Sequence, residues 1–129
     1  MHRGGAIMNV TDALKSLKPG AEWSCIGETY SGITWLDSSQ TKPTESEVNA
    51  EITRLTNAEP MRLLRLERNA RLTACDWIIT MHKELGTNIP AAWKTYRQSL
   101  RDLPASASPS LDSDGFLDLS SVTWPTEPS

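Results

Sequence analysis

The sequence predicts a helix-rich α+β protein with a small N-terminal β-hairpin, about three helices and an extended C-terminal tail. Three observations predict this class. Two short alternating apolar segments lie within residues 22–36, apolar residues recur at helical spacing across 44–103, and residues 104–129 are rich in serine, proline and aspartate. With 129 residues, 38% of them apolar, and a net charge of −3, the chain can bury one small core and attracts no polyion strongly.

Four ranges of the sequence are expected to behave differently. Residues 1–8 form a leader that we expect to be disordered, and Met8 is an alternative start. Residues 9–38 form a short helix plus β-hairpin module, and residues 39–103 form a helical domain. Residues 104–129 form an acidic Ser/Pro-rich tail with a tryptophan anchor, which we expect to be solvated more readily than folded back.

The first element after the leader is a short helix. Asn9 or Thr11 can cap it, and Pro19-Gly20 ends it. In the two strands that follow, apolar residues alternate with Ser24 and Thr34, which is the pattern of a half-buried hairpin. An isolated hairpin is only marginally stable in water, so its apolar face needs a helix or a partner against it.

A capping box marks the start of the next helix. Thr44 and Glu47 can each satisfy a free backbone amide of the other, and one apolar face follows them. Pro60 should break or kink this helix. A second helix of up to about 26 residues then follows an apolar stripe that begins at Leu63, and Gly86 ends it.

The last predicted helix begins with Pro90 in its first turn and stops at Pro104. Its aromatic and aliphatic residues share one face, and two arginines border that face. Trp124 lies further along the chain, in a C-terminal segment with few apolar neighbours in sequence. We predict that these residues form a docking surface for a protein partner, consisting of Trp93, Tyr96, Arg97, Leu100, Arg101, Leu103, Trp124 and Pro125. The other three tryptophans, Trp23, Trp35 and Trp77, favour core packing.

Nothing in the sequence favours catalysis. Cys75 and His82 would lie about 10 Å apart on one helix, beyond hydrogen-bond reach, and no catalytic or nucleotide-binding motif is present. We therefore predict no enzyme, no catalytic residue and no cofactor.

Metal and nucleic-acid sites are also disfavoured. The histidines and cysteines lack the close spacing of zinc ligands, and the calcium-loop pattern starting at Ser110 ends at Ser121 instead of a bidentate glutamate. An arginine band could pair with phosphates, but a solvated helix face, or contact with an acidic strip on a protein, is also consistent with it. The band consists of Arg62, Arg65, Arg68 and Arg71.

No signal-peptide core or membrane-spanning run is present, so we expect reduced cysteines in a cytoplasmic compartment and no membrane partner.

Three segments resemble one known family. Residues 64–77, residues 92–104 with their Tyr-Arg-Gln-Ser-Leu-Arg-Asp-Leu-Pro run, and the closing Trp124-Pro125-Thr126 resemble the C-terminal domain of phage tail assembly chaperone-like and tail-fibre-associated proteins. Residues 32–37 and 43–48 are similar to the front of small tail proteins. The chain departs from the family pattern in the helical run after Trp77 and in its long acidic segment before Trp124.

The resemblance implies a chaperone-like protein that binds a tail-fibre subunit through an aromatic helical face. It implies action in the host cytoplasm during assembly, and retention in the virion tail is an open alternative. A permanent structural component of the tail fibre or baseplate is the second hypothesis, and oligomerisation within the tail is compatible with both. A nucleic-acid-binding accessory protein and a cryptic hydrolase are more distant alternatives.

Overall fold

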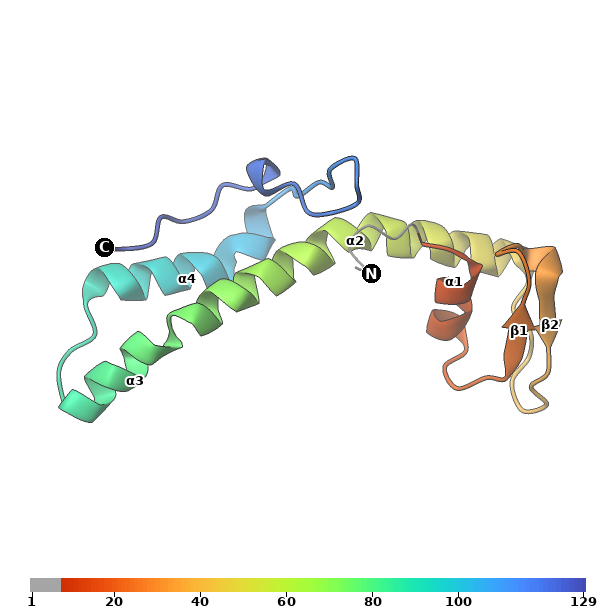
Figure 1. Cartoon of the computed structure of the whole chain (residues 1–129), viewed down its shortest axis with the longest axis horizontal. Helices are drawn as coiled ribbons and strands as arrows, with labels where there is room; N and C mark the ends of the chain where they lie inside the picture. The colour runs from red at the N-terminus through yellow and green to blue at the C-terminus, as the bar shows by residue number, and fades with distance from the viewer. Residues whose placement is uncertain (1–7) are drawn as a thin grey trace. The chain divides into compact units, whose positions relative to one another are not determined.

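The computed structural model of the chain describes residues 8–129, which form two compact units (Figure 1). We call residues 8–59 the N-terminal unit and residues 60–129 the helical unit. The division falls inside the long helix α2 (Glu45–Ala74). The predicted leader, apart from Met8, lies outside the described residues. The helix-rich α+β class is confirmed, whereas the domain ranges expected from the sequence stay predictions.

The N-terminal unit begins with helix α1 (Val10–Leu17). Asn9 caps it, because the Asn9 side chain accepts from the Asp12 amide at 3.0 Å and the Asp12 carboxylate accepts from the Asn9 amide at 3.1 Å. The apolar face of α1 is buried through Val10, Ala13 and Leu14. The predicted capping by Asn9 is therefore confirmed.

Strands β1 (Trp23–Cys25) and β2 (Ile33–Trp35) form the predicted antiparallel hairpin. Ser24 is paired with Thr34 and both are exposed, so the alternation predicted from the sequence is confirmed. The other face packs on a core built from α1 and the start of α2, which supplies the cover that a two-stranded hairpin needs. The buried members of this core are Val10, Ala13, Leu14, Ile33 and Val48.

Helix α2 begins at the predicted capping box. The Glu47 carboxylate accepts from the Thr44 amide at 2.8 Å, and the Thr44 hydroxyl accepts from the Glu47 amide at 3.1 Å. Hydrogen bonding to the carboxylate from the Thr44 backbone first and from the Thr44 side chain second favours the ionised form and lowers the pKa of Glu47.

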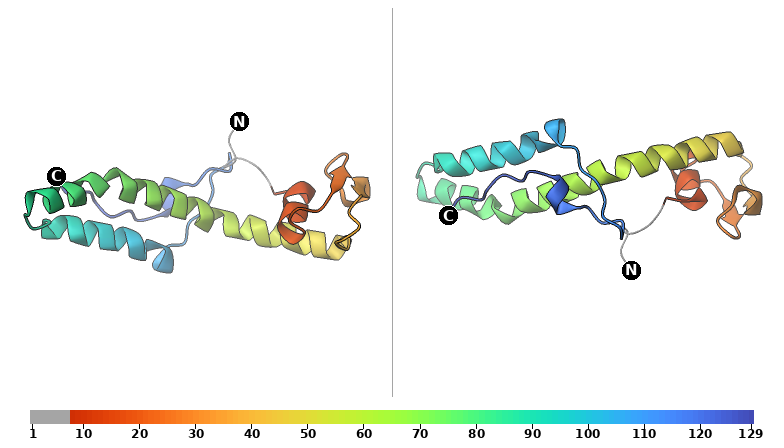
Figure 2. Two further views of the ribbon diagram at one scale, coloured as in Figure 1. Left: turned by 90° about the horizontal axis from the view of Figure 1, so that it is seen from below. Right: turned by 90° about the horizontal axis from the view of Figure 1, so that it is seen from above.

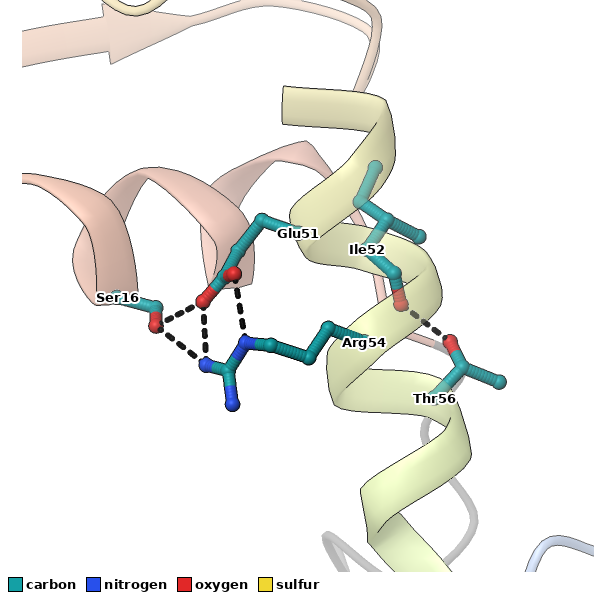
Figure 3. A network of polar contacts seen from close by, with 5 residues as sticks. All are labelled: Ser16, Glu51, Ile52, Arg54 and Thr56. Atoms are coloured by element: carbon teal, nitrogen blue, oxygen red, sulfur yellow. Dashed lines mark hydrogen bonds and ion pairs between the residues drawn. The ribbon is translucent and has the colours of Figure 1, made fainter. Parts of the chain in front are cut away.

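One turn later, Glu51 ties α2 to α1 (Figure 3). Its carboxylate accepts from the Arg54 guanidinium at 2.6 and 2.8 Å and from the Ser16 hydroxyl of α1. The residue is only 8% exposed. Hydrogen bonds from Arg54 first and Ser16 second lower the pKa of Glu51 to about 2.

Of the break or kink predicted at Pro60, the break is wrong, because α2 continues through the proline to Ala74, and the kink stays a prediction. A proline inside a helix leaves the carbonyl four residues earlier, here that of Thr56, without its usual amide donor. The helix persists because good helix formers flank the proline and because α2 packs into the core of each unit, through Val48 in one and Leu64 in the other. Both of those side chains are fully buried.

The single long helix expected from Leu63 onwards is also wrong. α2 ends at Ala74, and α3 (Asp76–Leu85) begins two residues later. Cys75 lies between them with φ −113° and ψ 10°, which is outside the helical region. Neither glycine nor proline marks this position, and the apolar periodicity continues across it, so the sequence does not predict the break between the two helices.

The helical unit is completed by α3 and α4 (Ala91–Ser106), and Figure 2 shows α4 running beside α3 and the end of α2. Gly86 ends α3 as predicted, with φ +69°. The stop predicted at Pro104 is wrong by two residues, because the carbonyl of Leu103 still accepts an amide, that of Ala107, at 3.0 Å.

The segment after α4 folds back along the helical unit (Figures 1 and 2). Val122 is buried and Trp124 packs against the core, whereas Phe116 and Leu119 are 39% and 49% exposed and Asp112 and Asp114 are exposed. The expectation of a solvated tail is therefore wrong for Val122 and Trp124, whose contacts favour an ordered segment.

Candidate partner-binding surface

Arg97 lies at the junction of α2, α3 and α4. Its Nη1 donates to the Leu72 carbonyl and to Cys75 Sγ, both at 3.0 Å, and its Nη2 lies 2.8 Å from Asp76 Oδ1. The Leu72 carbonyl also accepts the backbone amide of Cys75 at 3.2 Å, so the guanidinium adds a second donor at the end of α2. Burial acts to lower the pKa of Arg97, but the bonds to Cys75 and Asp76 outweigh it and raise that pKa.

This geometry gives Arg97 a structural role. Its side chain is 16% exposed and its hydrogen bonds go to groups of its own chain. The sequence predicted Arg97 at the polar rim of a docking surface. Arg101, its predicted companion at the rim, is exposed and donates to the Gln98 side chain at 2.8 Å.

The predicted aromatic face of α4 points largely into the core. Tyr96 is 7% exposed and Leu100 is fully buried, in a cluster with Cys75 and Ile78. Trp93 is half-buried and stands edge-on to Tyr96, with ring centroids 5.7 Å apart and an interplanar angle of 87°. Such edge-to-face pairs are favourable for aromatic rings. The structure thus brings these residues together as a core, and their role toward a partner stays a prediction.

Trp124 returns to the helices as an anchor. The Arg71 guanidinium lies 4.0 Å from the centroid of its indole ring, and the indole Nε1 donates to the Leu119 carbonyl at 3.2 Å. Glu67 holds Arg71 in place through a 2.9 Å ion pair. A cation over the face of tryptophan is a favourable pairing, and it helps to explain why the tail is ordered.

The remaining predicted site residues border a small hollow. Leu103 and Pro125 are half-buried and, with Trp124, line a depression of about 360 Å³ beside α4. The structure therefore brings these three together, although they come from α4 and from the distant tail.

The arginine band predicted on α2 is partly occupied within the chain. Arg71 is held by Glu67 and Trp124, and Arg68 donates to the Asn69 side chain and to the Arg101 carbonyl. Fewer guanidinium groups are therefore available for phosphates than the sequence suggests.

Three exposed or half-exposed apolar residues on α3 were missed by the sequence reasoning. Trp77 is 61% exposed and Leu85 is 66% exposed, with half-buried Met81 between them at four-residue spacing. We call these three residues the α3 stripe. The sequence placed Trp77 in the core because its periodicity was counted from Leu63, and the break at Cys75 changes that phase. An apolar periodicity counted from Asp76, the first residue of α3, is compatible with Ile78 as the buried residue in place of Trp77.

A shallow groove runs between α3 and α4. It encloses about 590 Å³ and is lined by Ile79 of α3 and by Lys94, Thr95, Arg97, Gln98 and Arg101 of α4. We call it the α3–α4 groove. Its lining contains three cations and no carboxylate, although Asp76 pairs with one of the three.

Within residues 8–129, no cluster of three or more histidine, cysteine, aspartate or glutamate side chains could hold a metal ion. In the same part of the chain, no helix is both long and apolar enough to span a membrane. Cys25 and Cys75 are free thiols. In the acidic turn, Asp112 Oδ1 accepts the backbone amides of Asp114 and Phe116, so this carboxylate stabilises the turn itself.

Comparison with known proteins gives one match. A family model described as phage tail assembly chaperone protein matches residues 61–129, more than half of the chain. The match begins one residue after the start of the helical unit and includes all of α3, α4 and the returning tail. No curated protein and no solved structure matches the chain.

Proposed function

This chain belongs to the phage tail assembly chaperone protein family, and from that membership we propose that it binds a tail-fibre subunit through apolar side chains of its helical unit. The family gives the protein a chaperone-like role, as the resemblance read from the sequence predicted. The identity of the client and the contact surface are proposals that go beyond family membership. Both rest on what the helical unit exposes.

The observation that supports this surface best is the α3 stripe. Two large apolar side chains, Trp77 and Leu85, are each more than half exposed on a helix of ten residues within the family-matched region. Tryptophan often supplies much of the binding energy at protein interfaces, and exposed apolar residues in one stripe are typical of a surface that a partner covers. We propose that the stripe shields apolar surface of the fibre subunit until that surface is buried by assembly.

The residues predicted from the sequence contribute in two ways under this proposal. Half-buried Trp93, Leu103, Trp124 and Pro125 offer part of their surface to the client. Buried Tyr96 and Leu100, together with Arg97, hold α4 in place beneath that surface, and exposed Arg101 lies at its edge.

We further propose that the protein acts without catalysis, in the host cytoplasm while tails assemble. Shielding an apolar surface requires contact area and reversibility, and neither requires bond chemistry. Small contacts of this kind give modest affinity, which allows the client to be released.

The test is coexpression of this chain with the tail-fibre subunit of the same phage. Wild type should raise the yield of soluble fibre trimer, and the double variant Trp77→Ala/Leu85→Ala should lose most of that gain. The matched control is Ile26→Ala/Leu36→Ala, which truncates two exposed apolar residues of the N-terminal unit, 80% and 60% exposed. If wild type leaves fibre solubility and trimer yield unchanged, the chaperone proposal fails.

The protein content of purified particles tests whether binding is transient. A transient chaperone should be absent from finished particles. Presence in a fixed ratio to the fibre would instead support a permanent structural component of the tail fibre or baseplate.

A further inference from the structure

The lining of the α3–α4 groove carries an excess of positive charge. Its side chains are basic, neutral or apolar, in a protein whose net charge is −3. An excess of one sign within a concave surface favours a ligand of the opposite sign.

Two of the groove's cations are available to a ligand. Lys94 and Arg101 are exposed, and within residues 8–129 neither forms an ion pair. Arg97 is committed to Asp76, so it adds little net charge. The groove therefore presents two free positive charges, seven residues apart on α4.

The spacing of these charges suggests the shape of the ligand. Seven residues are two turns of a helix, so the backbone positions of Lys94 and Arg101 lie about 10 Å apart along α4. A partner helix that lies along the groove brings two acidic residues into register when they too are seven positions apart.

The groove also has apolar character. Ile79 forms part of its wall from α3, and the aliphatic stems of Lys94 and Arg101 add further apolar surface. An apolar residue midway between the two acidic ones would meet this wall. A nucleic acid fits less well, because its binding depends on neutralising many phosphates, and two free cations neutralise few.

We propose that the α3–α4 groove binds an acidic helical segment of the client polypeptide, with carboxylates two turns apart on Lys94 and Arg101 and an apolar side chain on Ile79. This inference rests on the proposed function, because it names the chemistry of the segment that the chaperone recognises. It adds a second contact to that of the α3 stripe.

Binding at this groove is expected to be weak and reversible. Exposed ion pairs each contribute little and are screened by salt. Replacing both cations by glutamate turns two attractions into two repulsions, so we expect about a tenfold loss of affinity.

The test uses a fluorescent helical peptide of roughly 15 residues as the probe, with two glutamates seven positions apart and a leucine midway. Fluorescence anisotropy measures its binding to the full chain. Lys94→Glu/Arg101→Glu should weaken binding about tenfold. Lys15→Glu/Arg65→Glu, which makes the same charge change at exposed sites outside the groove, should leave binding within about twofold of wild type.

Two further ligands complete the experiment. A matched peptide with glutamine in place of both glutamates should bind wild type about tenfold more weakly. A single-stranded oligonucleotide should bind wild type and Lys94→Glu/Arg101→Glu with the same affinity. Equal weakening by both double variants would overturn the proposal in favour of general charge attraction. Groove-dependent binding of the oligonucleotide, or equal binding of the glutamine peptide, would overturn it as well. Circular dichroism of each variant confirms that the helices are retained.

Coexpression separates a failure of the groove from a failure of the proposed function. If wild type and Lys94→Glu/Arg101→Glu raise fibre yield equally, the groove does not hold the client although the chaperone role stands. If wild type itself has no effect on the fibre, the chaperone role fails whatever the peptide shows.

Discussion

Arg97 of α4 and Asp76 at the start of α3 form an ion pair of 2.8 Å, directly beside the Leu72 carbonyl that the same guanidinium also binds. One side chain of α4 therefore connects the end of α2 with the start of α3. Because the guanidinium has five N–H donors in a rigid fork, it can satisfy all of these groups at once.

Arg97→Ala should destabilise the helical unit by about 1–3 kcal/mol, because it removes hydrogen bonds to the Asp76 carboxylate and to the Leu72 carbonyl. Arg97→Lys should recover only part of this loss, since one ammonium cannot reproduce the fork. The midpoint of urea unfolding measures the effect. Arg101→Ala is the control, and similar midpoints for the two alanine variants would contradict a structural role for Arg97.

Trp124→Ala should lower the free energy of unfolding of the helical unit by about 2 kcal/mol, since the variant loses the Arg71 contact and packing against the core. Trp77→Ala is the matched control, because it deletes an indole of the same unit that is 61% exposed. We expect less than about 0.5 kcal/mol for the control. Chemical denaturation followed by circular dichroism compares the two, and a larger effect at Trp77 would contradict the observed packing.

The stability of the N-terminal unit should depend on acid through Glu51. Its pKa is about 2 in the folded chain and lies below the ordinary value of 4.5, so folding favours the ionised carboxylate. The stabilisation is therefore complete above the ordinary pKa and is lost as pH falls from about 5 toward 2.

Thermal melting across this pH range tests the role of Glu51. Glu51→Gln should flatten the acid side of the profile, although Asp37, whose pKa is also lowered to about 2, keeps part of the slope. Glu45→Gln makes the same charge change on an exposed residue of α2 and should leave the profile close to that of wild type. An unchanged profile for Glu51→Gln would exclude the carboxylate as the source.

Pro60→Ala should stabilise α2 by about 1–3 kcal/mol, because alanine restores an amide donor for the Thr56 carbonyl and removes the proline ring from the preceding turn. The helical signal at elevated temperature measures the gain. Pro19→Ala, outside the helices, controls for the general effect of removing a proline. A loss of stability at position 60 would show that the proline is needed where it lies.

Local signals in the sequence were sufficient to predict much of the secondary structure of the N-terminal unit. The Thr44–Glu47 capping box and the alternation around Ser24 and Thr34 involve residues within a few positions of one another, so their geometry follows from short-range sterics and hydrogen bonding. The family was also readable, because its motif is a run of contiguous residues in α4.

The helical unit was harder to predict because long-range contacts decide it. The break at Cys75 depends on a guanidinium more than twenty positions away, and the order of the tail depends on the meeting of Arg71 and Trp124. Neither contact leaves a local pattern. The burial of Tyr96 and Leu100 depends on long-range packing of the same kind.

Pro60 has one more consequence, which concerns how the protein can be divided. A chain that starts at residue 60 would place this proline in the first turn of a shortened α2, where its fixed φ and missing amide are favourable. The residue that weakens the long helix would then begin a stable one. We therefore expect the family-matched portion to be separable by shortening α2 at this position, which would allow client binding by each unit to be measured on its own.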